Sequence, residues 1–104
     1  MAKNYVNSGD TIVMAAPTGG FVAGLPYVVN DLAVVPLSSG PKGTMITCSA
    51  AGVWKLPVAD GIGAGVKVSA LDGALVAAGT DKAQPFGKLT TDPVGGYAEV
   101  LIVQ

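Results

Sequence analysis

The chain has 104 residues with a formal net charge of −1, and only 12% of its residues are charged. An ordinary soluble domain has about 25% charged residues, so we expect a surface with more alanine, valine and glycine than usual. This length supports one small hydrophobic core and leaves no room for a second domain. The chain has six lysines and no arginine, and it therefore lacks the basic surface that a nucleic-acid partner requires.

Glycine and proline interrupt the chain frequently, and the longest stretch without either runs from Tyr27 to Val35. That stretch is much shorter than the ~20 apolar residues that cross a bilayer, so we expect no membrane partner. The first five residues lack the apolar region of a secretory signal, which predicts synthesis in the cytoplasm. Because almost any helix of average length, about 11–12 residues, would contain one of these breakers, long helices are excluded.

The segments between the breakers are rich in Val, Ile and Thr and often alternate, which predicts short strands. We therefore predict an all-β fold, a small β-barrel or β-sandwich formed by residues 11–104 as a single domain. The predicted strands are Thr11 to Ala15, Pro26 to Val29, Leu32 to Leu37, Thr44 to Ser49, Gly52 to Leu56, Val66 to Ser69, Ala74 to Ala78, Gln84 to Thr90 and Tyr97 to Val103. The glycine-rich segment from Pro57 to Gly65 predicts a loop. The last strand is apolar on both faces near its end, which predicts burial there on both sides.

Part of the sequence repeats. Residues Leu37 to Gly43 align with Leu89 to Gly95 at a constant offset of 52. Each copy contains a Pro-Xaa-Gly turn, in which proline presets φ and glycine supplies a positive φ, and a predicted strand follows. We therefore predict two similar β-hairpins, one in each half of the chain. We attribute a shorter match, between Val22 to Leu25 and Gly63 to Val66, to shared glycine and alanine composition.

No motif predicts a catalytic residue, a cofactor or a metal site. Around Gly87-Lys88, a phosphate-binding loop would need a glycine in place of Lys82 and a hydroxyl residue in place of Leu89. Six of the seven acids are aspartates beside or within turns, where carboxylates usually bond to nearby backbone N–H groups. Cys48 has no second cysteine and no histidine in the chain, which excludes an intrachain disulfide, a zinc site and a Cys–His nucleophile. We interpret Cys48 as a small buried hydrophobic residue.

Two features are candidates for contacts with other protein subunits. The first ten residues form a polar segment with two large apolar side chains, Tyr5 and Val6. This segment is either a frayed terminus or an extended arm that lies across a neighbouring subunit through Lys3, Asn4, Tyr5 and Val6. The second candidate is Trp54, which either belongs to the core or anchors a subunit seam.

Short motifs occur in a characteristic order along the whole chain. They are Ala2 to Val6, Gly9-Asp10, Ala16 to Gly20, Gly24, Leu32 to Val35, Gly40 to Gly43, Gly52 to Pro57, Phe86 to Leu89, Gly95-Gly96 and Ala98 to Val103. In this order and spacing they resemble the capsid cement (head decoration) proteins of tailed phages. The chain departs from the family pattern at Trp54, where the motif usually has phenylalanine.

This resemblance implies a structural protein without enzymatic activity or cofactor, made in the cytoplasm of a bacterial host and located on the outer capsid surface of the virion. Its implied partners are the major capsid protein, between whose capsomers it binds, and other copies of itself in a homotrimer. There it stabilises the shell against the pressure of the packaged DNA. The alternatives are another virion component, such as a tail or head-completion subunit, and a small β-barrel enzyme or ligand-binding protein.

Overall fold

The computed structural model describes residues 9–104, and this part of the chain contains nine β-strands and no helix. The predicted all-β fold is confirmed. The strands are β1 (Thr11–Ala15), β2 (Tyr27–Val29), β3 (Leu32–Pro36), β4 (Met45–Ser49), β5 (Val53–Pro57), β6 (Lys67–Leu71), β7 (Ala74–Ala77), β8 (Gln84–Leu89) and β9 (Tyr97–Ile102). Each predicted strand is present, with ends that agree within two residues. The predicted loop from Pro57 to Gly65 is confirmed for residues 59–65, which contain only turns and irregular backbone. Pro57 instead ends β5, and Val58 forms an isolated bridge with Leu75.

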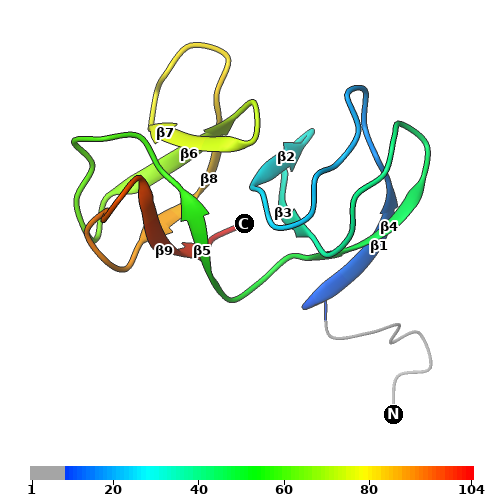
Figure 1. Ribbon diagram of the computed structural model, residues 1–104, viewed down its shortest axis with the longest axis horizontal. Helices are drawn as coiled ribbons and strands as arrows, with labels where there is room; N and C mark the ends of the chain where they lie inside the picture. The colour runs from blue at the N-terminus through cyan, green and yellow to red at the C-terminus, as the bar shows by residue number, and fades with distance from the viewer. Residues whose placement is uncertain (1–8) are drawn as a thin grey trace.

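The strands form two antiparallel sheets that occupy two lobes (Figure 1). The first sheet has the strand order β1-β4-β3-β2, and the second has the order β5-β9-β8-β6-β7. In Figure 1, β2 and β3 lie on the side of the first sheet that faces the second sheet, where they contact β8. The edge strand β2 and its neighbour β3 in the first sheet therefore meet the central strand β8 of the second.

The second sheet repeats the topology of the first. Strands β5, β9, β8 and β6 are arranged as β1, β4, β3 and β2 are, with the same antiparallel pairs, and β7 is an additional edge strand. The first pair of β1 and β4, Thr11 and Ser49, corresponds to the first pair of β5 and β9, Val53 and Leu101. The edge-strand residues of these two pairs are 42 positions apart in the sequence, and the central-strand residues are 52 positions apart. The two predicted hairpins, β3–β4 and β8–β9, are confirmed as part of this larger repeat.

The shorter match that we attributed to composition also belongs to the repeat, so that interpretation is wrong. In the first copy the N–H of Leu25 donates to the carbonyl of Val22 at 3.3 Å. In the second copy the N–H of Val66 donates to the carbonyl of Gly63 at 3.2 Å. Both copies thus make the same tight turn before β2 and before β6.

Ten additional residues distinguish the second copy from the first. Asn30 and Asp31 alone join β2 to β3, whereas residues 72–83 join β6 to β8 and include β7. Asn30 and Asp72 occupy equivalent positions, and both have a positive φ angle, 57° and 51°. Asparagine and aspartate tolerate this conformation better than most residues with a side chain. The same kind of turn therefore leads directly to β3 in one copy and into an inserted hairpin in the other.

The predicted N-terminal arm lies mostly outside the described residues, since the description begins at Gly9. Asp10, the last residue of the predicted arm, already belongs to the first sheet, because its carbonyl accepts a hydrogen bond from the N–H of Ala50 at 2.8 Å. The equivalent bond in the second copy joins the N–H of Ile102 to the carbonyl of Gly52 at 3.0 Å. Asp10 therefore takes part in the hydrogen bonding of the first sheet.

Two clusters of buried side chains form the interior, and β3 contributes to both. Ala33 and Val35 pack with residues of the second sheet, whereas Val34 packs with residues of the first. Successive side chains of a strand point to opposite faces, so β3 is the wall that the two clusters share. Burial on both faces explains why Leu32–Val35 is an uninterrupted apolar run rather than an alternating one.

The last strand differs from its prediction. β9 alternates between buried and exposed positions along its whole length, and Leu101 is 40% exposed. Val103, just after the strand, is 42% exposed. The prediction of burial on both faces is therefore wrong. Only one face of β9 packs on the core, and its other face points away from it.

The side chain of Gln104 joins the two lobes at the C-terminal end of the chain, which lies between them in Figure 1. Its Oε1 accepts a hydrogen bond from the N–H of Ala33 at 3.0 Å, and its Nε2 donates to the carbonyl of Ala33 at 2.7 Å. The same Nε2 donates to the carbonyl of Ala50 at 2.8 Å. β3 pairs with β4 only through Val35 and Pro36, so Ala33 has no backbone partner on β4. The side-chain amide of Gln104 takes the place of that partner.

Replacing Gln104 with alanine is expected to lower the free energy of unfolding by about 1–3 kcal/mol, since it leaves backbone groups of Ala33 and Ala50 without partners. Glutamate at this position should destabilise more, because a carboxylate has no proton to donate to the two carbonyl oxygens. Urea unfolding measures both changes. Gln84→Ala is the matched control, because Gln84 is exposed and no described residue bonds to its side chain. Equal stability of the three variants would contradict the role of Gln104.

Candidate interaction surfaces

The ionisable groups of the structure are dispersed. Within residues 9–104, no group of three or more histidine, cysteine or acidic side chains is placed to hold a metal ion. The aspartates lie in turns and loops, as predicted. Asp92 differs in detail from the expectation of a local bond, because its Oδ1 accepts a hydrogen bond at 2.9 Å from the N–H of Ala64, 28 residues earlier. This carboxylate therefore ties two loops of the second lobe together.

Cys48 lies on the central strand β4 and is fully buried in the core of the first lobe. Its Sγ donates to the carbonyl of Ile46 at 3.7 Å. Burial raises the pKa of the thiol, because the apolar surroundings disfavour the charged thiolate. The interpretation of Cys48 as a buried hydrophobic residue is confirmed.

Trp54 lies on β5 at the margin of the larger core cluster. Its side chain is partly buried and packs against that cluster, and its indole Nε1 donates to the carbonyl of Ala51 at 3.1 Å. The ring also lies close to Gly52, where an added Cβ atom would lie 3.6 Å from Nε1. The structure thus agrees with the core interpretation for the inner part of the ring, and a contact between subunits through its exposed part stays a prediction. The other predicted contact residues, Lys3, Asn4, Tyr5 and Val6, lie outside the described residues.

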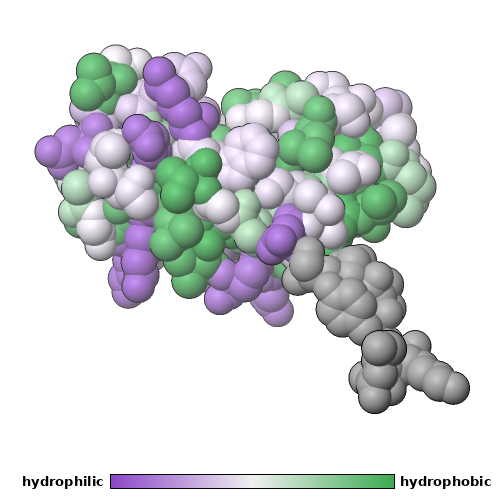
Figure 2. Space-filling view, turned by 90° about the horizontal axis from the view of Figure 1, so that it is seen from below, coloured by the Kyte–Doolittle hydropathy of each residue, from purple (hydrophilic) through white to green (hydrophobic). Residues whose placement is uncertain are grey.

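The outer face of the second sheet exposes apolar side chains that the sequence analysis did not single out. Val53 and Leu101 face each other across β5 and β9, with 51% and 40% of their surfaces exposed. Tyr97, further along β9, is 47% exposed and lies opposite Pro57. Figure 2 shows hydrophobic residues gathered on the lobe that contains these two strands, next to hydrophilic ones. The alternation of residues along β9 could have indicated which side chains point outward. It was hard to recognise in the sequence because some of the outward-facing residues are also apolar.

The first sheet presents a similar face on the equivalent strands β1 and β4. Met45 is the equivalent of Tyr97, since both begin the central strand of their copy, and it is 63% exposed. Val13, on the adjacent edge strand, is 61% exposed and lies opposite Thr47. The repeat therefore places exposed apolar side chains on the same strand pair of both lobes. Isolated exposed valines are ordinary on protein surfaces. Here exposed apolar side chains recur at equivalent positions of the two lobes.

The part of the chain that the structure describes holds no helix able to cross a membrane. No family model, no curated protein and no solved structure matches the chain.

Proposed function

We propose that this chain is a structural component of a phage virion, a cement protein that binds the outer surface of a tailed-phage head and catalyses no reaction. In this proposal it is made in the cytoplasm of the bacterial host. On the head it contacts the major capsid protein and further copies of itself, as a homotrimer at three-fold or quasi-three-fold positions. The order of its sequence motifs supports the proposal, and so does the chemistry of its surface.

The observation that carries the proposal is the pair of exposed apolar faces on β1–β4 and β5–β9. On the second face the charged pair Lys55 and Glu99 lies between Tyr97 and the Val53–Leu101 pair, whereas the first face has no charged residue on β1 or β4. The equivalent points of the two faces are marked by Met45 and Tyr97. Side chains of this kind are enriched at the cores of protein interfaces, where they exclude water. One chain with two such faces is suited to lie between two neighbouring proteins, which is the task of a cement protein.

Many weak contacts are sufficient for this task. Opening a shell requires several copies to dissociate together, so the stabilising effect multiplies without tight binding by any single copy. The edge strands β1 and β5 add a second means of attachment, because an unpaired edge accepts a strand from another protein. Edges left uncovered in solution would favour aggregation, which is a physical reason for them to be covered in an assembly.

Reconstitution with expanded, undecorated phage heads tests the proposal. We expect binding to saturate at a fixed ratio to the major capsid protein, and we expect the temperature of DNA release to rise on saturation. The double variant Met45→Lys, Tyr97→Lys places a charge on each apolar face and should reduce occupancy strongly, because a buried unpaired charge is costly. Since both side chains are exposed, the variant should keep the wild-type melting temperature within a few degrees.

Val22→Lys is the matched control, because Val22 is 52% exposed and belongs to the loop between β1 and β2, outside both strand pairs. It should bind as the wild type does. Full occupancy by the double variant would contradict the role of the two faces. Saturation at only a few copies per particle would favour the alternative, a tail or head-completion subunit. A ligand that raises the melting temperature of the isolated monomer would instead favour a binding protein or enzyme.

A further inference from the structure

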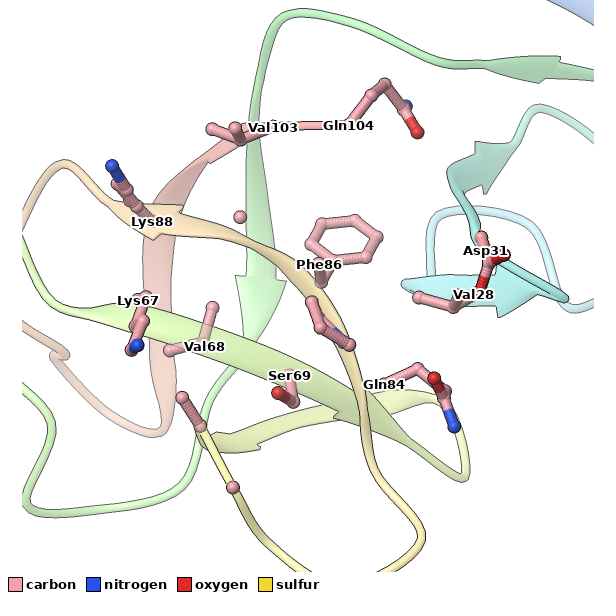
Figure 3. A pocket seen from close by; sticks show the side chains of 14 residues that line it. Val28, Asp31, Lys67, Val68, Ser69, Gln84, Phe86, Lys88, Val103 and Gln104 are labelled. Atoms are coloured by element: carbon pink, nitrogen blue, oxygen red, sulfur yellow. The ribbon is translucent and has the colours of Figure 1, made fainter.

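A groove of about 420 Å³ lies where the second sheet meets the turn between β2 and β3 (Figure 3). Lys67 and Lys88, which are cross-strand partners on β6 and β8, line it together with Phe86. The two ammonium groups point apart in Figure 3, and both lysines are exposed. The groove therefore does not gather its charged groups around one ligand, whereas the edge strand β1 presents a regular row of unpaired backbone groups.

β1 forms the end of the first sheet that lies farther from the second lobe (Figure 1). It pairs with β4, and no other described strand pairs with it. The N–H of Ala16, just after β1, donates to the carbonyl of Thr44 at 2.9 Å, so the even-numbered residues of β1 bond toward β4. In an antiparallel ladder, alternate residues direct their backbone groups to opposite sides. The N–H and C=O groups of Thr11, Val13 and Ala15 therefore point toward the free edge, where no described residue bonds to them.

These outward groups are complementary to those of a second copy of the same strand. When Val13 lies opposite Val13 of the second copy in an antiparallel pairing, Thr11 lies opposite Ala15 of that copy, and Ala15 lies opposite its Thr11. All three residues then form hydrogen-bonded pairs, and each pair exchanges two bonds. The first sheets of the two copies become one continuous sheet, in which the outward groups of all three residues have partners.

The side chains of β1 suit the same register. On the outer face Val13, which is 61% exposed, lies beside Val13 of the second copy. On the inner face Ile12 lies opposite Met14 of the second copy, and both are partly buried residues that pack against the core of the first lobe. Apolar cross-strand pairs of this kind stabilise a sheet. β1 has no charged residue, and Asp10, just before it, lies opposite Ala16 of the second copy, so no like charges meet.

The equivalent edge of the second sheet is protected against such pairing. β5 bonds to β9 in the same pattern as β1 bonds to β4, so Lys55 and Pro57 occupy the places of Val13 and Ala15. If two copies paired through β5, their Lys55 side chains would lie face to face, and like charges at such positions repel. Pro57 has no N–H to donate. Lysine and proline are residues by which natural edge strands avoid pairing, so the chain protects one edge of its repeat and leaves the equivalent edge open.

We infer that two copies of this chain associate through their β1 edges, in an antiparallel pairing centred on Val13. A contact of this kind uses the same surface of both copies and closes on itself as a dimer. The homotrimer of the proposed function instead requires contacts between different surfaces of neighbouring chains. The inference therefore adds a separate contact between copies, and it does not depend on the proposed function.

Sedimentation equilibrium and amide hydrogen exchange of the full chain, over a wide range of concentrations, test the inference. We expect the mass to rise from the chain mass of 10.3 kDa toward twice that value. Over the same range the amide exchange of Thr11, Val13 and Ala15 should slow, because these amides gain partners only in the dimer. The amides of Ile12 and Met14 bond to β4 and should be protected at every concentration. A wild type that stays monomeric would overturn the inference, and so would an assembly in which the three outward amides exchange as fast as in the monomer.

Two variants transfer the protection of β5 to β1. Val13→Lys places like charges face to face, and Ala15→Pro removes an outward N–H without breaking a hydrogen bond inside the chain. Each should weaken the association about tenfold or more. The monomer should keep its circular dichroism spectrum, because both side chains are exposed. The matched controls Val13→Thr and Ala15→Val keep a neutral side chain and the N–H, and they should associate about as well as the wild type. Unchanged association of either Val13→Lys or Ala15→Pro would overturn the inference.

Discussion

Replacing Gly87 with alanine is expected to lower the free energy of unfolding by about 3 kcal/mol or more, or to prevent folding. Gly87 lies on β8, and a Cβ atom there would overlap the carbonyl oxygen of Leu101 and approach the Cα of Ile102 at 3.3 Å. Both atoms belong to the backbone of β9, which is paired on both sides, with β5 and with β8. The backbone of a strand held on both sides cannot move without loss of its hydrogen bonds. Urea unfolding followed by circular dichroism measures the effect.

Gly63→Ala is the matched control for this substitution. The nearest atom to an added Cβ at Gly63 is Oδ1 of Asp92 at 3.6 Å, an ordinary contact, and the φ angle there is not in the left-handed region. We expect the control to change stability by less than about 0.5 kcal/mol. If Gly87→Ala were as stable as Gly63→Ala, the close approach of β8 to β9 would be contradicted.

Replacing Phe21 with alanine is expected to destabilise both lobes together, by about 3–5 kcal/mol. Phe21 is 2% exposed in the core of the first lobe, and its ring centroid lies 5.0 Å from that of Tyr27. Because β3 is the shared wall of the two clusters, loss of packing on one side also loosens the surface on which the other packs. We therefore expect one cooperative transition, in which the fluorescence of Trp54 in the second lobe shifts as far as the circular dichroism does.

Val22→Ala, a neighbouring and exposed position, should leave the transition nearly unchanged and serves as the control. Two separate transitions in Phe21→Ala, with the fluorescence of Trp54 unmoved, would show that the lobes unfold independently. That result would mean that β3 and the Gln104 amide do not couple the two sheets.

Local chemistry in the sequence was sufficient to place the strands. Glycine and proline occur too often for helices, and the Val, Ile and Thr between them favour extended backbone, so each strand was predicted within two residues. The Pro-Xaa-Gly segments at Pro41 and Pro93 revealed the β3–β4 and β8–β9 hairpins, because the seven-residue segments that contain them align without gaps at one constant offset. The burial of Cys48 followed from the absence of any partner for its thiol.

The sequence did not reveal that whole sheets repeat, because the inserted hairpin changes the offset from 42 to 52 residues midway and few residue identities survive. Nor did it reveal which apolar residues of β9 face outward, since that depends on whether another layer covers the sheet. The like-charge pair of Lys67 and Lys88 arises only from the pairing of strands about twenty residues apart in the chain. Register across such distances is set by how the sheets pack, and only the tertiary structure determines it.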